Sequence, residues 1–412
     1  MVGLLSLPPP LLTRILSLLS CPHRAAFLLV STYARKLGSC PALWWDVSAV
    51  SRSRLQSDGL EPLLALHRFS QLAVLDLGQL RLQFSAPLAR QLLAWFHNNS
   101  RLTRVCLAGN DLSGLPAFPL ATSLARCPVL QLSDTRLNTE QLNSLLGKCA
   151  GGRYTSHLDL SFNDLSHVNL ELLEAGARGL QSLGLAHTDL SNLQARAILL
   201  AVNDSKLVEL DLSGADLTGC SLDNIGLNFE LTRLTLSEVR LQPERLDRVL
   251  TNLGLLSSLA HLTLSGSVLH AADPILFSDA VVRVRRVELN FCWLYRDHIE
   301  FLLDAITEKT ALRHLDLSGN HFEGVNRDLL LEGARYLTSL RLEWANLAGE
   351  QLETLIFDTD QLVGLTIILN HFELLDNHLD LHRAAKLNPA IQLNQAEGNK
   401  EAVVKELSSS CY

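Results

Sequence analysis

Several features that identify common protein classes are missing from this sequence of 412 residues. Lysine and arginine number 35 against 43 acidic residues and are scattered along the chain, so the formal net charge is −8. We therefore expect no basic surface for nucleic acid or membranes. Aromatic residues make up only 6% of a chain that is 47% hydrophobic, which indicates a core built largely of leucine.

The sequence also lacks a continuous apolar run of about 18 residues, the length that a membrane-spanning helix needs. Its apolar start has no basic leader and is interrupted by Pro8, Pro9, Pro10 and Arg14, so we expect no signal peptide. Eight cysteines occur without a CxxC pair or a regular spacing. In a chain of this length, that pattern indicates reduced thiols and a cytoplasmic or nuclear location.

Motifs for phosphate binding or hydrolysis are absent as well. The sequence has no P-loop, HExxH, GxSxG or GxGxxG pattern, so we expect neither catalysis nor a cofactor. His157, His261 and His314 share one position of the repeat described below, but their repeats are at least two strands apart. Such a separation is about 9.5 Å or more. Because zinc ligands bind at about 2.0–2.1 Å, we expect no metal site.

One short pattern recurs through most of the chain and is clearest in residues 155–165, which read TSHLDLSFNDL. Leu158 and Leu160 alternate with polar residues, as in a strand with one buried and one exposed face. Degenerate copies at residues 44–49 and 391–393 look like opening and closing strands. The first positions of the full copies are Leu72, Leu102, Cys127, Thr155, Leu180, Leu207, Leu231, Leu259, Val284, Leu312, Leu337 and Leu362.

Long and short repeats alternate, with a double period near 53 residues. Most short repeats have asparagine eight residues after their start, whereas the long repeats have other residues there. A buried asparagine can satisfy backbone groups in a turn and stack from repeat to repeat. The asparagines are Asn110, Asn163, Asn320 and Asn370.

The segments between the predicted strands have the marks of helices. Residues 191–194 form a capping-box pattern, and Pro243 stands where the first turn of a helix tolerates proline. Ile299, Leu302 and Leu303 form an apolar stripe at helical spacing. Each repeat is therefore expected to contain one strand and one helix.

This alternation resembles the ribonuclease-inhibitor class of leucine-rich repeats. The resemblance implies an α/β horseshoe-shaped solenoid, with parallel strands inside and helices outside, over residues 45–395. Residues 396–412 would form a C-terminal cap or tail. A single repeat cannot bury both its strand and its helix faces, so neighbouring repeats must stack.

The first 44 residues follow a different pattern, with two apolar helical stripes separated by Cys21 and Pro22. They resemble an F-box in Leu-Pro, Ile-Leu-x-x-Leu, Val-Ser and Pro-x-Leu-Trp elements at the family's spacing. Pro10, residues 21–25 and Ala34 depart from the family pattern. The matching residues are Leu7, Pro8, Ile15, Leu16, Leu19, Val30, Ser31, Pro41, Leu43 and Trp44.

The F-box resemblance implies a substrate-recognition subunit of a Skp–cullin–F-box E3 ubiquitin ligase. Residues 1–44 would bind a Skp-type adaptor beside a cullin scaffold, and the repeats would bind a protein substrate. Exposed contiguous apolar side chains usually mark a partner site. The residues expected to bind the adaptor are Leu7, Pro8, Leu11, Leu12, Ile15, Leu16, Leu19 and Val30.

Two other interpretations remain open. Residues 1–44 could be a helical cap that seals the first repeat of a leucine-rich scaffold or inhibitor. The repeat class also resembles that of Ran-type GTPase activators. That family typically has an acidic C-terminal tail, which the last residues of this sequence do not provide.

A few residues differ from the small polar side chains expected on the inner surface. We expect three arginines, spaced by 53 and 55 residues, to lie about 10 Å apart and bind an extended acidic or phosphorylated segment. Arginine and aromatic residues commonly anchor interfaces. Alternatively, the arginines form ion pairs with glutamates across the sheet. The acidic row of Asp76, Asp159, Asp211, Glu288 and Asp316 is ordinary repeat usage, so we expect it to be a solvated face and not a site of paired carboxylates. The expected substrate-binding residues are Arg233, Arg286, Phe291, Trp293, Arg341 and Trp344.

Overall fold

The computed structural model describes residues 46–47, 72–79, 81, 86–150, 154–220, 230–357, 365–370 and 391–394. The chain forms two compact units, which we call unit 1 (residues 1–216) and unit 2 (residues 217–412). The F-box-like segment, with all its expected adaptor-binding residues, lies outside the described residues, as does the tail after residue 394.

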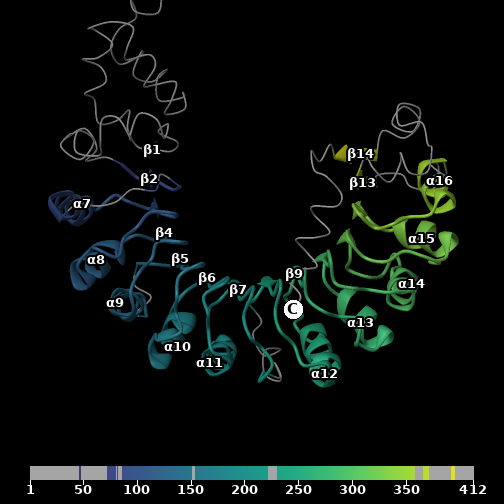
Figure 1. Cartoon of the computed structure of the whole chain (residues 1–412), viewed down its shortest axis with the longest axis horizontal. Coiled ribbons are helices and arrows are strands. Elements are labelled where there is room, and N and C mark those ends of the chain that lie inside the picture. Colours follow the sequence, from purple (N-terminus) through teal and green to yellow (C-terminus); the bar gives the residue numbers. More distant parts are fainter. Residues whose placement is uncertain are drawn as a thin grey trace, which may run out of the picture. The chain divides into compact units, whose positions relative to one another are not determined.

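Unit 1 is a series of parallel strands that pair in chain order, each followed by a return segment that is helical in most repeats. Its strands lie on the inner side of the unit and its helices on the outer side (Figure 1). The strands are β1 (Asp46–Val47), β2 (Val74–Asp76), β3 (Arg104–Cys106), β4 (Val129–Gln131), β5 (His157–Asp159), β6 (Ser182–Gly184) and β7 (Glu209–Asp211). The helices are α7 (Ala86–Asn98), α8 (Ala117–Leu124), α9 (Thr139–Cys149), α10 (Leu170–Gly179) and α11 (Asn192–Val202).

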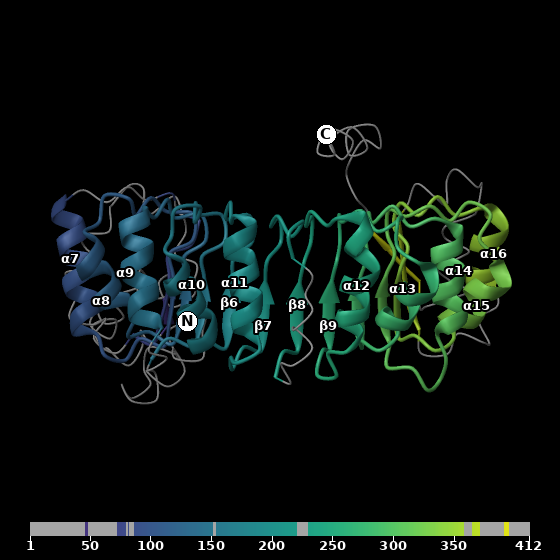
Figure 2. The ribbon, with the colours of Figure 1, turned by 90° about the horizontal axis from the view of Figure 1, so that it is seen from below.

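Unit 2 repeats the same arrangement, with its strands again parallel and in chain order. Its helices stand side by side in Figure 2. The strands are β8 (Arg233–Thr235), β9 (His261–Thr263), β10 (Arg286–Glu288), β11 (His314–Asp316), β12 (Ser339–Arg341), β13 (Thr366–Asn370) and β14 (Ile391–Asn394). The helices are α12 (Pro243–Gly254), α13 (Pro274–Val281), α14 (Arg296–Ala305), α15 (Arg327–Ala334) and α16 (Gly349–Phe357).

The leucine pattern produces this architecture directly. In β5, Leu158 is buried between two half-buried residues, and Leu160 is buried immediately after the strand. Fully burying one leucine contributes roughly 1.5–3 kcal/mol, and the same positions are buried in one repeat after another. The predicted leucine-rich repeat solenoid is therefore confirmed in each unit.

The predicted helix signals are also confirmed. Ser191 and Gln194 form a reciprocal capping box at the start of α11, and Pro243 opens α12. Helix length follows the alternation of the repeats. Helices α7, α9, α11, α12 and α14 of the long repeats have 13, 11, 11, 12 and 10 residues. Helices α8, α10, α13 and α15 of the short repeats have 8, 10, 8 and 8.

The buried asparagines hold the turns as expected. The Asn320 side chain, 2% exposed, donates to the carbonyls of Leu317 in its own repeat and of Leu289 in the preceding repeat. Its Oδ1 accepts from the backbone N–H groups of Cys292 and Leu294. Some long repeats place Thr or Cys at this position, as in Cys292, whose thiol donates to the carbonyl of Leu264. The asparagines therefore link pairs of repeats and do not form an uninterrupted ladder.

The predicted start of the last full repeat, Leu362, is wrong. Strand β13 places Ile367 opposite Leu340, an offset of 27 residues (367 − 340), where the prediction gave 25. Asn370 consequently lies within β13 and not in a turn. The corrected spacing restores the alternation of long and short repeats at this end of the array.

A second turn position alternates between large residues and glycine. We call it the turn residue; it lies two residues after the buried leucine that follows each strand. In four short repeats it is glycine with φ between 69° and 74°, and in the preceding long repeats it is a larger residue, also with positive φ. A Cβ at Gly214 would collide with the His187 ring, and one at Gly319 would collide with the Phe291 ring. Glycine therefore leaves room for the side chain of the preceding repeat.

Replacing Asn320 by leucine should destabilise the protein strongly. The change leaves two carbonyls and two N–H groups without their asparagine partner, and each buried unsatisfied group costs roughly 1–3 kcal/mol. We expect urea unfolding to show a loss of at least about 3 kcal/mol. The control Gln181→Leu removes an exposed amide and should change little. Equal losses in the two variants would contradict this role of Asn320.

Candidate protein-binding surface

The strands of unit 2 present two rows of side chains on the face opposite the helices. The middle residue of each strand is buried, so the first and third residues face the other way. The parallel register aligns the first residues into one row and the third residues into another. The first row is Arg233, His261, Arg286, His314 and Ser339, and the third row is Thr235, Thr263, Glu288, Asp316 and Arg341.

The first row is basic. Arg233 and Arg286 are exposed and lie on either side of β9, so the strand spacing places them about 10 Å apart, as expected from their 53-residue separation. Among the described residues, no carboxylate forms an ion pair with Arg286. His261 lies between the two arginines, and its Nε2 is 3.1 Å from a carboxylate oxygen of Glu288.

Arg341 does not belong to this row, contrary to the prediction. It pairs in register with Asp316, whereas Ser339 holds the position equivalent to Arg286. The 55-residue spacing is two residues longer than the repeat period and moves Arg341 to the third strand position. Its Nε lies 3.5 Å from Glu343. Arg341 therefore forms an ion pair with a carboxylate two residues further along its own repeat.

Arg285 is a basic residue that the sequence reasoning missed. It is exposed and precedes Arg286, and both lie close enough to His314 to act on its charge. Partial burial, together with the positive charges of Arg286 and Arg285, lowers the pKa of His314, which favours the neutral imidazole at pH 7. The adjacent arginine pair next to a strand position was the available signal in the sequence.

The third row is acidic and partly buried. Burial raises the pKa of the Asp316 carboxyl, while hydrogen bonds from Ser318 and the charge of Arg341 act in the opposite direction. Glu288 lies one strand away and adds a further negative charge. Arg341 therefore compensates the negative charge of a small group of carboxylates on the inner face. The acidic row was expected to be solvated, but at Asp316 it is partly buried.

The aromatic residues lie farther from the arginines than predicted. Phe291 and Trp344 are at matching turn positions, three residues past the ends of β10 and β12. The acidic third row lies between them and the arginine row, so they do not directly flank it. Phe291 is half-buried against Gly319. Trp293 is 41% exposed, and its ring centroid is 6.1 Å from that of His321.

The three histidines considered as metal ligands lie in separate environments. The ring of His157 contacts Ser156, that of His261 contacts Glu288, and that of His314 contacts Thr338. In the described parts of the chain, no group of three or more His, Cys, Asp or Glu side chains is arranged to hold a metal ion. None of the described helices has the length and apolar character needed to cross a membrane.

Comparisons with known proteins return relatives whose names include leucine-rich repeats. No protein-family model matches the chain. The mouse "NACHT, LRR and PYD domains-containing protein 12" is 26% identical over 303 residues, which is 68% of this chain and 28% of that protein. The human protein of the same name is 27% identical over 274 residues, 61% of this chain and 25% of its own length. The chain thus spans about a quarter of the relatives it matches.

Among solved structures, the leucine-rich repeat-containing protein LegL7 from Legionella pneumophila is 20% identical to this chain. The similarity covers 65% of this chain and 95% of LegL7, with a TM-score of 0.41. The fold is established by the repeat register and the strand pairing of this chain.

Replacing Arg341 by methionine should lower stability in a pH-dependent way. Arg341 lowers the pKa of Asp316, so its removal raises that pKa further and makes the ionised carboxylate less favourable in the folded state. The loss should reach up to about 1 kcal/mol at neutral pH, since the guanidinium is partly screened by water. It should shrink as the pH falls through the raised pKa of Asp316, where the carboxyl binds a proton.

Denaturant unfolding at several pH values measures this effect. Lys309→Met removes an exposed cation from the same unit and serves as the control. A loss of the same size at every pH would show that Arg341 acts through packing and not through the charge of Asp316.

Proposed function

We propose that this protein is the substrate-recognition subunit of a Skp–cullin–F-box E3 ubiquitin ligase. The chain is a leucine-rich repeat solenoid, an architecture whose extended surfaces commonly bind other proteins. The F-box-like spacing in residues 1–44 supports binding of a Skp-type adaptor, which would connect the chain to a cullin. Ubiquitin transfer would then be the work of the partners.

The exposed row of Arg233 and Arg286, with Arg285 beside it, is the observation that carries the substrate-binding part of this proposal. Two arginines about 10 Å apart match acidic groups three residues apart on a segment in the polyproline II conformation, which rises about 3.1 Å per residue and brings every third side chain to the same side. Guanidinium groups bind carboxylates and phosphates through paired hydrogen bonds. The substrate segment is therefore acidic or phosphorylated.

A further consequence concerns the orientation of the substrate. Glu288 and Asp316 lie two residues along the strands from the arginine row, about 7 Å away. They would repel a second acidic group placed on that side of the segment. The bound segment should therefore lie across the strands, along the basic row, and avoid the acidic one.

The adaptor interaction can be tested by affinity capture of the full chain from cells, scored for a Skp-type adaptor and a cullin. The variant Ile15→Lys, Leu19→Lys places charge in the apolar helical stripe and should abolish recovery of both. Arg233→Ala with Arg286→Ala is the matched control and should retain both. If the unaltered chain recovers neither, residues 1–44 are better explained as a cap on a leucine-rich scaffold or inhibitor.

The substrate surface can be tested separately with labelled short peptides rich in glutamate or phosphoserine. Loss of charge-assisted hydrogen bonds at Arg233 and Arg286 should weaken binding by about 10- to 100-fold, with an unchanged melting temperature. Arg283→Ala with Arg335→Ala removes two exposed arginines near the ends of α13 and α15 and should have little effect. Equal affinities of the two double variants would reject the basic row as the binding site.

A further inference from the structure

Phe162 occupies a position that four other short repeats give to glycine. The turn residue is Gly109, Gly214, Gly266 or Gly319 in those repeats, each with a left-handed backbone. Phe162 has the same backbone conformation, with φ of 58°. A left-handed conformation costs a side-chain-bearing residue roughly 1–2 kcal/mol. Because glycine would serve the turn at lower cost, the fold alone does not explain the phenylalanine.

The Phe162 ring is also largely outside the core, with 59% of the residue exposed. It stacks on His187, the turn residue of the next repeat, with ring centroids 5.0 Å apart and an angle of 20° between the planes. His187 itself lies against Gly214. The backbone N–H of Phe162 donates to Ala186, so the stacked pair is held by the same ladder that aligns the repeats. The result is a fixed aromatic surface facing solvent.

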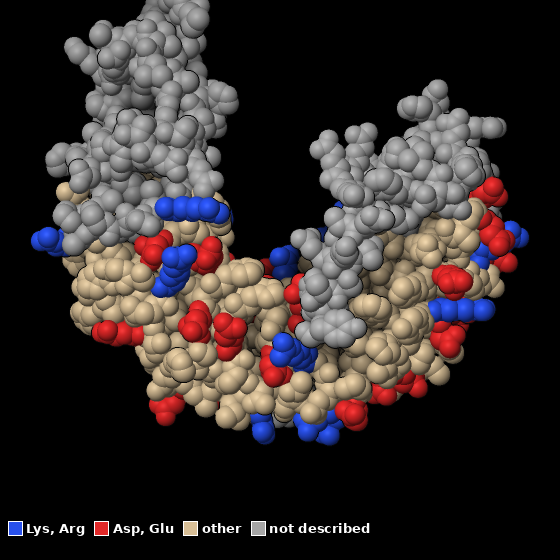
Figure 3. All heavy atoms as spheres, viewed as in Figure 1, with Lys and Arg blue, Asp and Glu red and all other residues tan. Residues whose placement is uncertain are grey.

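Three exposed aspartates belong to the turns that carry this pair and to the turn before it. The turn residue on the other side of Phe162 is Asp134, whose N–H donates to the carbonyl of Ser161. Asp164 and Asp189 follow Phe162 and His187 by two residues, and all three aspartates are exposed. Red side chains lie over several elements of unit 1 on the face shown in Figure 3, with blue ones among them.

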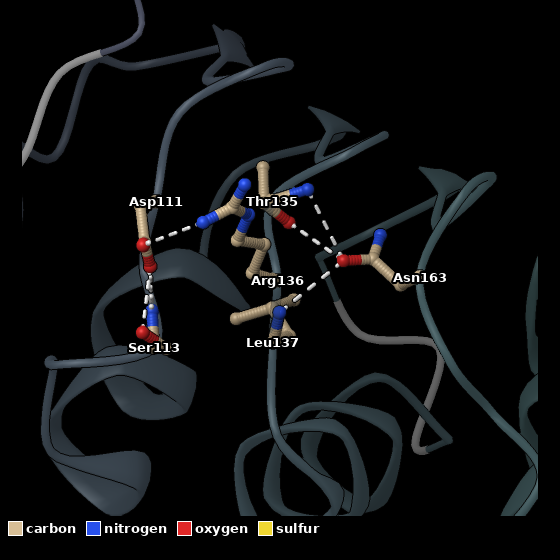
Figure 4. A network of polar contacts seen from close by, with 6 residues as sticks. All are labelled: Asp111, Ser113, Thr135, Arg136, Leu137 and Asn163. Carbon is tan, nitrogen blue, oxygen red and sulfur yellow. Dashed lines mark hydrogen bonds and ion pairs between the residues drawn. The ribbon is translucent and has the colours of Figure 1, made fainter.

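An arginine in the turn before Phe162 is paired with a carboxylate of the repeat before its own. Arg136 follows Asp134 by two residues, and its guanidinium forms an ion pair with Asp111 at 3.5 Å, on the side away from Asn163 (Figure 4). Asp164 accepts hydrogen bonds from the backbone N–H and hydroxyl of Ser166, which lower the pKa of its carboxyl and keep it ionised. The turns next to the aromatic pair therefore carry exposed negative charge.

We propose that Phe162 and His187, together with Asp134, Asp164 and Asp189, form a docking site for an arginine-bearing segment of a partner protein. A guanidinium can stack flat on an aromatic ring while its N–H groups reach carboxylates at the ring edge. Lysine offers a point charge without the planar stack, so arginine is preferred. This site lies in unit 1 and selects the opposite charge to the basic row of unit 2.

The probe for this site is a labelled peptide of alternating arginine and serine, with lysine and glutamate analogues, measured by fluorescence anisotropy at several salt concentrations. The arginine peptide should bind most tightly. Phe162→Gly should weaken it about fivefold or more. Asp164→Asn with Asp189→Asn should weaken it and reduce its salt dependence. Phe162→Gly restores the residue found in other short repeats and relieves the left-handed backbone, so the melting temperature should not fall.

Phe118→Ala is the matched control, because it removes another exposed phenylalanine of unit 1, on α8. It should leave the affinity unchanged. If Phe162→Gly lowers the melting temperature, Phe162→Asn removes the ring with a residue that adopts the left-handed conformation readily. The proposal is overturned if the arginine peptide does not bind, if the glutamate peptide binds as tightly, or if a folded Phe162 variant binds it normally.

Discussion

The surfaces of this protein depend on hydrogen bonds between buried turn side chains and the backbone of the preceding repeat. Asn163 accepts from the N–H groups of Thr135 and Leu137 and donates to the carbonyls of Leu132 and Leu160. These groups are shielded from water, so each would be costly without a partner. A shift of one repeat against the next would break several such bonds at once, and the register is therefore fixed.

Because the register is fixed, the spacing of two residues in the sequence determines whether they lie in the same row of the surface. Residues one double period apart occupy the same row, as Arg233 and Arg286 do, whereas a departure of two residues changes the row. Arg341 shows the consequence, because its shift places it among Asp316 and Glu343, where it compensates charge. The same residue type is thus exposed in one row and compensates negative charge in the adjacent one.

The leucine spacing was sufficient to predict the strands, the helices and their alternation, because these follow from burial and local capping. It was insufficient at residues 362–370. Leu365, Ile367 and Leu369 alternate in a way that is compatible with two registers two residues apart, and both bury the same face. Only the pairing with Leu340 distinguishes them. The row of Arg341 was misassigned for a related reason, because its spacing from Arg286 exceeds the double repeat by two residues and this changes its strand position.

The alternation of long and short repeats determines whether a large turn residue packs against its neighbour or stays exposed. Phe291 is in a long repeat, and the following short repeat provides Gly319, against which its ring is half-buried. Phe162 is in a short repeat, and the turn residue of the next repeat is His187. The imidazole of His187 stacks on the Phe162 ring, which remains exposed. Two phenylalanines with the same backbone conformation therefore differ in role according to the repeat class that contains them. In such an array, a bulky residue in a glycine position changes the surface while the hydrogen bonds that hold the turn remain intact.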